Sequence, residues 1–355
     1  MNDYASNAGL DAIADHLRGL DGPVMVLTHA KPDGDALGSV LAMTATLRSL
    51  GLDARPFFVA PIADSVRGLD PQGTGTVLDP ADADALPRDA AAYLVLDTGA
   101  FGQLGPQAQA VREHLDRTVI IDHHLSGDVE AALRFIDGTA AACCEIVADL
   151  IERLTGSGEL DRATAEWLFA GVASDTGWFR FSNTSPRTHR LAARLLDAGV
   201  DHSDLYAHLE QSERPEKLKL MVRAVRNLEL LCDDRVALMA LRKDDFEQSG
   251  AQEHETERLV DVPQVVGSVR VVALVTEATH HAAEAQGNGQ SAPLTRVSFR
   301  AKPGPDAVNV AALANRFGGG GHARAAGAKL EAPVDEVVQR LRDALPEALG
   351  NCGFA

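Results

Sequence analysis

The chain has 355 residues, of which 45% are hydrophobic and 24% are charged, and its formal net charge at pH 7 is −18. This length and composition predict a globular protein with two domains. The negative charge repels polyanions at long range, which argues against non-specific binding to duplex nucleic acid. Any anionic ligand is therefore expected to be small.

The four cysteines, at positions 143, 144, 232 and 352, form neither a CxxC motif nor a Cys/His zinc spacing. They predict no disulfide framework and no structural zinc site, and they fit a reducing compartment. The N-terminus lacks a basic region followed by an apolar one, and no apolar run approaches the roughly 18 residues of a spanning helix. We expect a cytoplasmic protein that does not bind membranes.

Short apolar runs alternate with helical patterns along residues 8–190. Strands are predicted at 24–28, 92–96 and 118–121, and helices at 10–20, 35–50, 143–154 and 163–174. Such alternation predicts an α/β domain with a parallel sheet that is covered by helices on both faces. Residues 191–231, with helices broken by Gly199 and Pro215, are expected to form a helical connector.

A second, smaller α/β domain is predicted at residues 232–346. Its expected strands are 236–241, 269–276 and 296–301, and its expected helices are 308–316 and 334–345. The stretch 282–292 has no apolar pattern and predicts a surface loop. We interpret the adjacent His280–His281 pair as part of that loop rather than a metal site, because no third ligand lies nearby in the sequence.

Acidic and histidine side chains cluster just after predicted strands or helices. The stretch THAKPDGDALG supplies the first three of them, and the full set is His29, Asp33, Asp35, Asp97, Asp122, His123, His124 and Asp175. Taken singly, each fits an ordinary turn, helix cap or satisfied core-edge group. Because the carboxyl ends of neighbouring parallel strands open on one crevice, we expect these groups to meet there.

Burying several carboxylates together without cations costs many kcal/mol in lost hydration and mutual repulsion. Carboxylates with a few imidazoles and no thiolate favour manganese or magnesium over zinc or copper. The four negative charges of Asp33, Asp35, Asp97 and Asp175 would be balanced by two divalent ions. This is the composition of a two-metal site for phosphoester hydrolysis.

The stretches HAKPDGDALGS, VLDTGA, IDHH and GVASDTGWFRFS resemble, in order and position, the four motifs of the DHH phosphoesterases. The resemblance implies two metal ions that share Asp97. The first would be held by His29, Asp33 and Asp97, and the second by Asp35, Asp97, His123 and Asp175.

The same resemblance implies roles for the other two residues of the IDHH stretch. Asp122 would orient a neighbouring ligand from outside the metal shell. His124 would face the scissile phosphate, either to stabilise developing charge or to protonate the leaving oxygen. Many relatives have Asn shortly after this motif, where this chain has Leu-Ser-Gly-Asp at 125–128.

The stretch FGGGGHARAAG, residues 317–327, contains four consecutive glycines. Glycines let backbone N–H groups curl around an anion, and a following helix start would add its positive end. A flexible linker is the alternative. The GK[ST] ending of a Walker loop is missing.

The stretch GGGGHARAAG also resembles the substrate-binding signature of the DHH-associated C-terminal domain, and VSFRAK resembles a strand that holds the nucleotide. The substrate-binding residues implied are Gly319, Gly320, Gly321, His322, Arg324, Ser298 and Arg300. Without the resemblance, Arg300 fits a surface charge equally well. The two domains are then expected to close a cleft, so that remote binding orients the reacting ester.

Within the family, this short acidic chain is most similar to the bifunctional nanoRNases and 3′-phosphoadenosine-5′-phosphate (pAp) phosphatases. The inorganic pyrophosphatases lack the GGGGH stretch, and the RecJ-type exonucleases are longer and have a basic channel. The resemblance implies a homodimeric hydrolase with two Mn²⁺ (Mg²⁺ possible), acting on nanoRNA, linear pApA, cyclic di-AMP and pAp. The alternatives are a catalytically silent nucleotide-sensing protein and a RecJ-like single-strand exonuclease.

Overall fold

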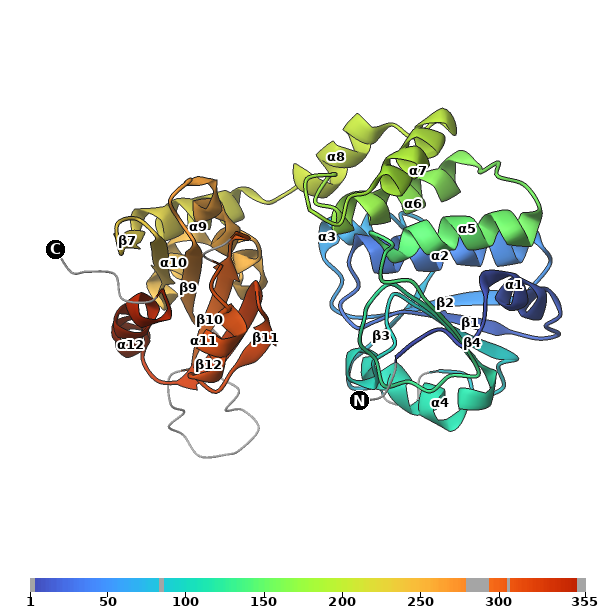
Figure 1. Cartoon of the computed structure of the whole chain (residues 1–355), viewed down its shortest axis with the longest axis horizontal. Coiled ribbons are helices and arrows are strands. Elements are labelled where there is room, and N and C mark those ends of the chain that lie inside the picture. The colour runs from blue at the N-terminus through green and yellow to red at the C-terminus, as the bar shows by residue number, and fades with distance from the viewer. Residues whose placement is uncertain (1–3, 83–85, 279–293, 305–306, 350–355) are drawn as a thin grey trace. The chain divides into compact units, whose positions relative to one another are not determined.

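The computed structural model describes residues 4–82, 86–278, 294–304 and 307–349. The chain divides into two units, Met1–Ser212 and Glu213–Ala355 (Figure 1). Of the predicted connector, helices α7 (Pro186–Asp197) and α8 (His202–Glu210) belong to the first unit and α9 (Pro215–Arg226) to the second. The His280–His281 pair, the predicted loop 282–292 and Cys352 lie outside the described residues.

A six-stranded parallel sheet forms the centre of the first unit. Its order is β3-β2-β1-β4-β5-β6. The strands are β1 (Val24–Leu27), β2 (Ala54–Val59), β3 (Thr76–Leu78), β4 (Ala92–Leu96), β5 (Thr118–Asp122) and β6 (Leu133–Ile136). The predicted α/β class with a parallel sheet is confirmed. The strand order reverses between β1 and β4, and such a switch point opens a crevice at the carboxyl ends of the strands.

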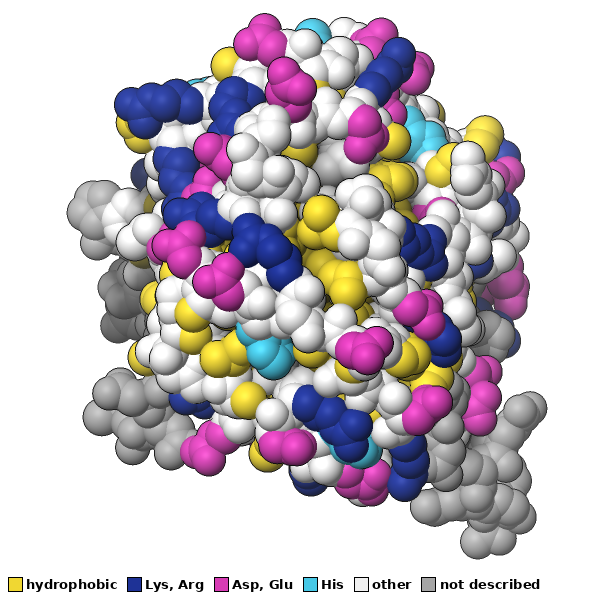
Figure 2. All heavy atoms as spheres, turned by 90° about the vertical axis from the view of Figure 1, so that its right-hand side faces the viewer, with side chains coloured by type: hydrophobic (Ala, Val, Ile, Leu, Met, Phe, Trp, Pro, Cys, Tyr) yellow, Lys and Arg dark blue, Asp and Glu magenta, His cyan; other side chains and the backbone are white. Residues whose placement is uncertain are grey.

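Both faces of this sheet are covered. One face packs against α1 (Leu10–Arg18), α2 (Gly34–Ser49), α5 (Cys143–Thr155) and α6 (Arg162–Asp175). The other packs against α4 (Ala108–Glu113) and neighbouring short turns. The remaining short helices are α3 (Asp64–Arg67), η1 (Phe101–Gln103), η2 (Gly105–Gln107) and η3 (Leu115–Arg117). On the molecular surface shown in Figure 2, acidic and basic side chains lie side by side.

Helix α2 is buried along most of its length because α6 and α5 pack closely against it. A Cβ atom at Gly38 would overlap the carbonyl oxygen of Trp167 in α6. One at Gly171 of α6 would lie 2.7 Å from the Oδ1 atom of Asp35. Only glycine permits this approach, which brings α6 against the first turn of α2, where Asp35 lies.

The second unit contains a mixed sheet of order β11-β12-β10-β9-β8-β7, in which only the described β8–β9 pair is parallel. The strands are β7 (Glu229–Leu231), β8 (Val236–Leu241), β9 (Val271–Glu277), β10 (Leu294–Ala301), β11 (Gly320–His322) and β12 (Ala325–Glu331). Helices α11 (Val310–Asn315) and α12 (Val334–Ala348) cover one face. On β8 and β9 the other face packs against α9, α10 (Lys243–Ser249) and η5 (Leu259–Val265), and η4 (Glu253–Thr256) lies between the last two along the chain.

The glycine-rich stretch 317–327 forms a β-hairpin. Strand β11 pairs antiparallel with β12 through a two-residue turn at Ala323–Arg324. A Cβ at Gly321, whose φ is +139°, would lie 2.6 Å from the Cα atom of Ala326. The glycines therefore let the two strands approach closely. The expectation that a helix begins after the glycines is wrong, since α11 precedes them and β12 follows, and the flexible-linker alternative is excluded by the strand pairing.

Among the described residues, no helix combines the length and the hydropathy that a membrane crossing requires.

Candidate metal centre

The turn after β1 carries three residues of the predicted cluster. Asp33 caps α2, because its Oδ1 atom accepts the backbone N–H groups of Asp35 and Ala36, each at 3.0 Å. The helix therefore begins at Gly34, and Asp35 in its first turn is fully buried. The side chain of Asp33 itself is about half exposed, at 55%.

Two imidazoles point their Nε2 atoms toward the carboxylates. The Nδ1–H group of His29 donates to the carbonyl oxygen of Ala30 at 3.0 Å, and that of His123 donates to Ala140 at 3.4 Å. A carbonyl can only accept, so in the neutral imidazole each bond selects the tautomer whose Nε2 lone pair is available to a metal ion. This is the arrangement of a metal-ligating histidine.

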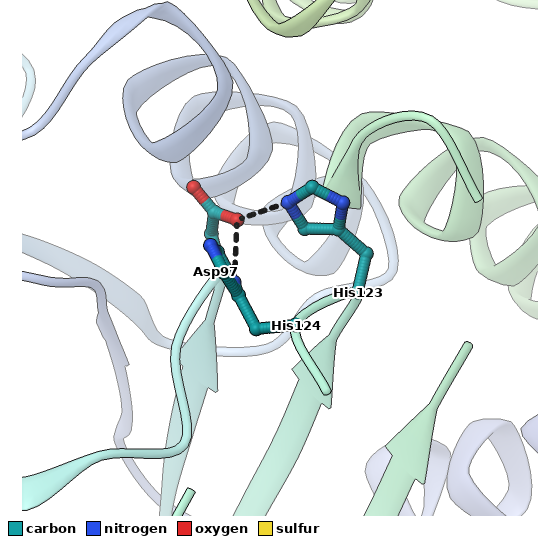
Figure 3. Close-up of side chains that lie close together, drawn as sticks. All are labelled: Asp97, His123 and His124. Atoms are coloured by element: carbon teal, nitrogen blue, oxygen red, sulfur yellow. Dashed lines mark ion pairs between the residues drawn. The ribbon is translucent and has the colours of Figure 1, made fainter. Parts of the chain in front are cut away.

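Asp97 lies between the two imidazoles, directly after β4. Its Oδ2 atom is 3.5 Å from Nε2 of His29. Its Oδ1 atom is 3.3 Å from Nε2 of His123 and 3.8 Å from Nδ1 of His124 (Figure 3). Its φ of +63° is a left-handed conformation that is uncommon for a residue with a side chain. Such strain concentrates at functional sites.

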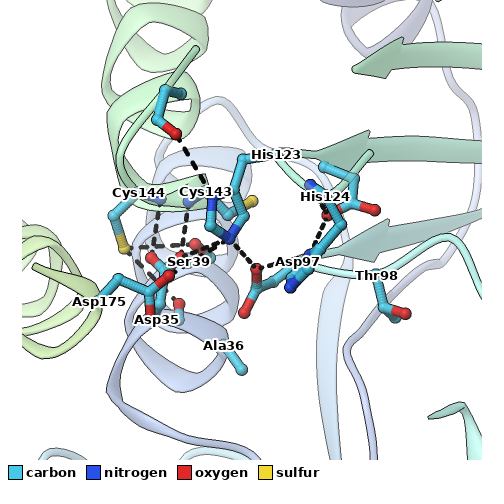
Figure 4. Close-up of polar contacts among 12 residues, drawn as sticks. Asp35, Ala36, Ser39, Asp97, Thr98, His123, His124, Cys143, Cys144 and Asp175 are labelled. Carbon is cyan, nitrogen blue, oxygen red and sulfur yellow. Dashed lines mark hydrogen bonds and ion pairs between the residues drawn. The ribbon is translucent and has the colours of Figure 1, made fainter. Parts of the chain in front are cut away.

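The carboxylate of Asp35 is held by the N-terminus of α5. The backbone N–H groups of Cys143 and Cys144 donate to its Oδ2 and Oδ1 atoms at 2.6 and 2.9 Å (Figure 4). The positive end of the helix stabilises the anion. Sequence reasoning missed these donors, because they belong to the backbone and carry no residue-type signal.

Asp175, the last residue of α6, completes the group from the other side of α2. Its Oδ2 atom lies 3.3 Å from Nε2 of His123, which is in turn 4.0 Å from Oδ2 of Asp35. The side-chain amide of Asn183 donates to the Asp175 backbone carbonyl at 3.1 Å and to that of Ala141 at 3.0 Å. Asn183 thereby ties the end of α6 to the start of α5.

The described residues contain three groups whose potential metal-ligating atoms lie within 4.8 Å of one another. They are His29 with Asp33 and Asp97, Asp35 with His123 and Asp175, and Asp97 with His123 and His124. All six residues predicted as metal ligands thus lie together. Their role as ligands remains a prediction.

Two buried atoms in the cluster have no hydrogen-bond partner among the described residues: Oδ1 of Asp97 and Nε2 of His123. An unsatisfied buried polar atom is costly, and both atoms have lone pairs that a cation can accept. Burial and the charge of Asp97 raise the pKa of Asp35 to about 7. Burial and the charge of Asp35 raise the pKa of Asp175 to about 9. These raised pKa values show that the carboxylates repel one another, and divalent cations would relieve that repulsion.

The chain matches the DHH family, N-terminal domain, over residues 23–172, and the DHHA1 domain over residues 253–351. It is 30% identical over 344 residues to the bifunctional oligoribonuclease and PAP phosphatase NrnA of Thermus thermophilus, which covers 96% of this chain and 95% of that protein. The chain belongs to the DHH family. The NrnA protein of Bacillus subtilis is 27% identical over 86% of this chain and 89% of its own length.

Among solved structures, an exopolyphosphatase-related protein from Bacteroides fragilis matches this DHH protein with a TM-score of 0.85. The two are 23% identical, and the match covers 98% of each chain. This likeness shows that the fold is shared across both units.

The three residues of the Asp-His-His stretch of this DHH protein, Asp122, His123 and His124, make different contacts. His123 joins the carboxylate cluster, whereas Asp122 is turned away from it and accepts both the backbone N–H and the Nδ1–H of His124, at 3.1 and 2.8 Å. Its other oxygen accepts the hydroxyl of Tyr4 at 2.7 Å. Sequence reasoning missed Tyr4, since no local motif surrounds it.

The residues predicted to bind substrate lie together in the DHHA1 region. Register pairs Ser298 with Gly327 and Gly327 with Gly320, and likewise Arg300 with Ala325 and Ala325 with His322. Directly paired residues of antiparallel strands share a face, so Ser298, Arg300, Gly320 and His322 lie on one face of the sheet. Arg324 is exposed in the hairpin turn, and Gly319 and Gly321 shape the hairpin. Their substrate contacts remain predictions.

Proposed function

We propose that this protein is a two-metal-dependent phosphoesterase. It hydrolyses short oligonucleotides and dinucleotides, namely nanoRNA, linear pApA and cyclic di-AMP, to 5′-mononucleotides, and it removes the 3′-phosphate of pAp. The observation that carries the proposal is the central position of Asp97, whose two oxygens face different imidazoles. A carboxylate in this position is suited to bridging two cations.

The chain's own residues would hold the ions in two sets. His29, Asp33 and Asp97 would hold one, and Asp35, Asp97, His123 and Asp175 the other. Bound divalent ions lower the pKa of a coordinated water and neutralise charge on the phosphate. Oxygen-rich sites with imidazole suit manganese, with magnesium as the second choice.

We propose that His124 acts on the leaving oxygen. Its Nδ1–H is committed to Asp122, and half of its side chain surface is exposed, at 46%. The hydrogen bond to Asp122 raises the pKa of His124, which keeps the imidazole protonated over a wider pH range. A protonated Nε2 can donate to the oxygen that departs from phosphorus.

Substrate choice is proposed to lie in the second unit. Ser298, Arg300 and His322 present hydroxyl, guanidinium and imidazole groups on one sheet face, and the positions between them are glycine and alanine. Small residues leave room for a ligand to lie against the backbone. The curated relatives named as oligoribonucleases and PAP phosphatases support short nucleotides as the ligand class.

A panel of substrates tests the proposal. The purified protein is incubated with pApA, cyclic di-AMP, a five-nucleotide RNA, pAp and a forty-nucleotide single-stranded DNA, with Mn²⁺, Mg²⁺ or EDTA, and products are separated by chromatography. We expect 5′-AMP from the adenine substrates with Mn²⁺ and none with EDTA. Binding without turnover would indicate a nucleotide sensor, and preferred degradation of the long strand would indicate an exonuclease.

Two further proposals concern the protein in the cell. We expect a homodimer in solution, which light scattering measures directly. We also expect the protein in the cytoplasm, where its proposed nucleotide substrates arise.

A further inference from the structure

The N-terminal segment, residues 4–8, runs along β6 and brings Tyr4 to Asp122, beside the candidate metal centre. Its residues pair with β6: the backbone N–H of Asn7 donates to the Arg134 carbonyl at 3.0 Å, and Asn7 Oδ1 accepts the Arg134 N–H at 2.6 Å. The Ile136 N–H donates to the hydroxyl of Ser6 at 2.8 Å. These contacts fix the segment along β6, which pairs with β5 and has Ile136 in register with Asp122.

Tyr4 is the first residue of this segment, and its side chain lies where two residues, Gly99 and Gly127, have no side chain. A Cβ atom at Gly99 would overlap the phenol group of Tyr4. One at Gly127 would overlap the Tyr4 ring and lie 2.6 Å from the Gly99 carbonyl oxygen. The Asp128 N–H donates to that same carbonyl at 2.9 Å, which holds the two loops together. The phenol position is therefore enclosed by the loops that follow β4 and β5.

The Tyr4 hydroxyl is the hydrogen-bond donor to one oxygen of the Asp122 carboxylate. Tyr4 donates to Oδ2 of Asp122 at 2.7 Å, while both other hydrogen bonds to the Asp122 carboxylate in the described chain come from His124 and end on Oδ1. Asp122 is fully buried, so each of its oxygens needs a donor. Burial and the charge of Asp122 raise the pKa of Tyr4, so the phenol retains its proton.

We infer that Tyr4 is a positioning residue for the leaving-group step of the proposed phosphoesterase reaction, on which this inference rests. By holding Asp122, Tyr4 keeps the Nδ1–H of His124 engaged and directs Nε2 toward the substrate. Water oxygen forms the new bond to phosphorus as the bond to the leaving oxygen breaks. The electron pair of the broken bond stays on the leaving oxygen, which takes the Nε2 proton, while the water proton passes to solvent and His124 becomes neutral.

The test compares two phosphodiesters whose leaving groups differ. In pApA hydrolysis the leaving ribose oxygen needs a proton, whereas the p-nitrophenolate of thymidine 5′-p-nitrophenyl phosphate leaves without one. We expect Tyr4→Phe to lower kcat for pApA about tenfold, with KM within about twofold, and to leave kcat for the nitrophenyl ester within about twofold. Phe retains the ring, so the space beside Gly99 and Gly127 stays filled.

The matched control is Tyr93→Phe. The Tyr93 hydroxyl donates to the Pro87 carbonyl at 2.8 Å in the same unit, so its loss removes one partly buried hydrogen bond away from the cluster. We expect this variant to lower the unfolding temperature without changing the ratio of the two kcat values. Equal losses on both substrates in Tyr4→Phe, or no loss on pApA, would overturn the inference.

A double-mutant cycle with His124→Asn checks that Tyr4 acts through His124. In the His124→Asn background, Tyr4→Phe should change kcat for pApA less than twofold, whereas independent effects would multiply. Multiplying effects would overturn the inference while leaving the proposed function standing. A wild-type protein inactive on both esters with Mn²⁺ would overturn the proposed function, and this inference with it.

Discussion

The Oδ1 atom of Asp97 lies 3.3 Å from the Nε2 atom of His123, and neither atom has a hydrogen-bond partner among the described residues. Both atoms are buried, and the residue that carries Oδ1 has a strained, left-handed backbone conformation. Folding maintains this contact at a cost in free energy, which a cation bound by both atoms would offset.

Removing the central carboxylate should therefore abolish metal-dependent activity. We expect Asp97→Ala to lower kcat for pApA at least about a thousandfold and to weaken Mn²⁺ binding in calorimetry, while the circular dichroism spectrum stays native. Asp197→Ala, at an exposed position at the end of α7, is the control and should behave like the wild type. Activity retained by Asp97→Ala at saturating Mn²⁺ would contradict the ligand assignment.

Metal binding should strengthen as the pH rises. The raised pKa values of Asp35, about 7, and Asp175, about 9, mean that protons occupy these carboxylates near neutrality when no cation is bound. A cation must displace them, so the affinity for Mn²⁺ should increase from about pH 6 to about pH 9. Calorimetry at pH 7 in two buffers of different ionisation enthalpy measures the protons released. Equal apparent enthalpies in both buffers would contradict this prediction.

The metal-free protein should lose stability over the same range. Between the ordinary carboxyl value of 3.8 and the raised pKa of Asp35 or Asp175, the folded state binds more protons than the unfolded chain. The free energy of unfolding then falls as pH rises through this interval. His29 adds to this loss of stability. Burial lowers its pKa, but the larger opposing effect of Asp97 and Asp33 brings it to about 9, above its ordinary value of 6.5. Thermal unfolding with EDTA from pH 5 to 9 measures the loss, which saturating Mn²⁺ should reverse.

The hairpin turn should contribute to substrate binding rather than to chemistry. The Arg324 side chain is exposed, and its backbone carbonyl accepts the Ala301 N–H at 2.9 Å, so Arg324→Ala leaves the turn anchored. We expect this variant to raise KM for pApA about tenfold and to leave hydrolysis of bis(p-nitrophenyl) phosphate nearly unchanged. Arg340→Ala, on α12 across the sheet, is the matched control. Equal effects of Arg324→Ala on both substrates would count against a binding role.

Two neighbouring glycines of the hairpin should differ sharply in their tolerance of alanine. Gly321→Ala should destabilise the protein by about 1–3 kcal/mol, because φ is +139° and the new Cβ meets Ala326. Gly320→Ala should cost less than about 0.5 kcal/mol, since the nearest atom to its Cβ would be 3.8 Å away. Urea unfolding measures both. Similar losses would argue against the close pairing of β11 with β12.

Local pattern predicted much of the fold. The strands at 92–96 and 236–241 were predicted with the bounds that the structure has, because continuous apolar runs mark buried strands. Strand β2 was not predicted, since Arg55 and Pro56 interrupt its apolar run. The stretch 317–327 was misassigned because glycines lack side chains, so no periodicity marks the strand that they form.

The candidate site was predicted less evenly. The acidic and histidine residues carry a residue-type signal and follow strand ends, so their meeting could be expected from parallel-sheet geometry. The groups that hold them carry no such signal. Tyr4 is 118 positions from Asp122 in the chain, and the donors to Asp35 are backbone N–H groups of α5.

Residue type and patterns within a few positions predicted which chemical groups stand at the strand and helix ends, and many of the segments that form strands and helices. Three-dimensional packing sets which oxygen faces which nitrogen, brings Tyr4 to Asp122, and pairs the glycine run as a hairpin. Such contacts depend on strand order and close packing between distant segments, where glycine, backbone and long-range hydrogen bonds act together.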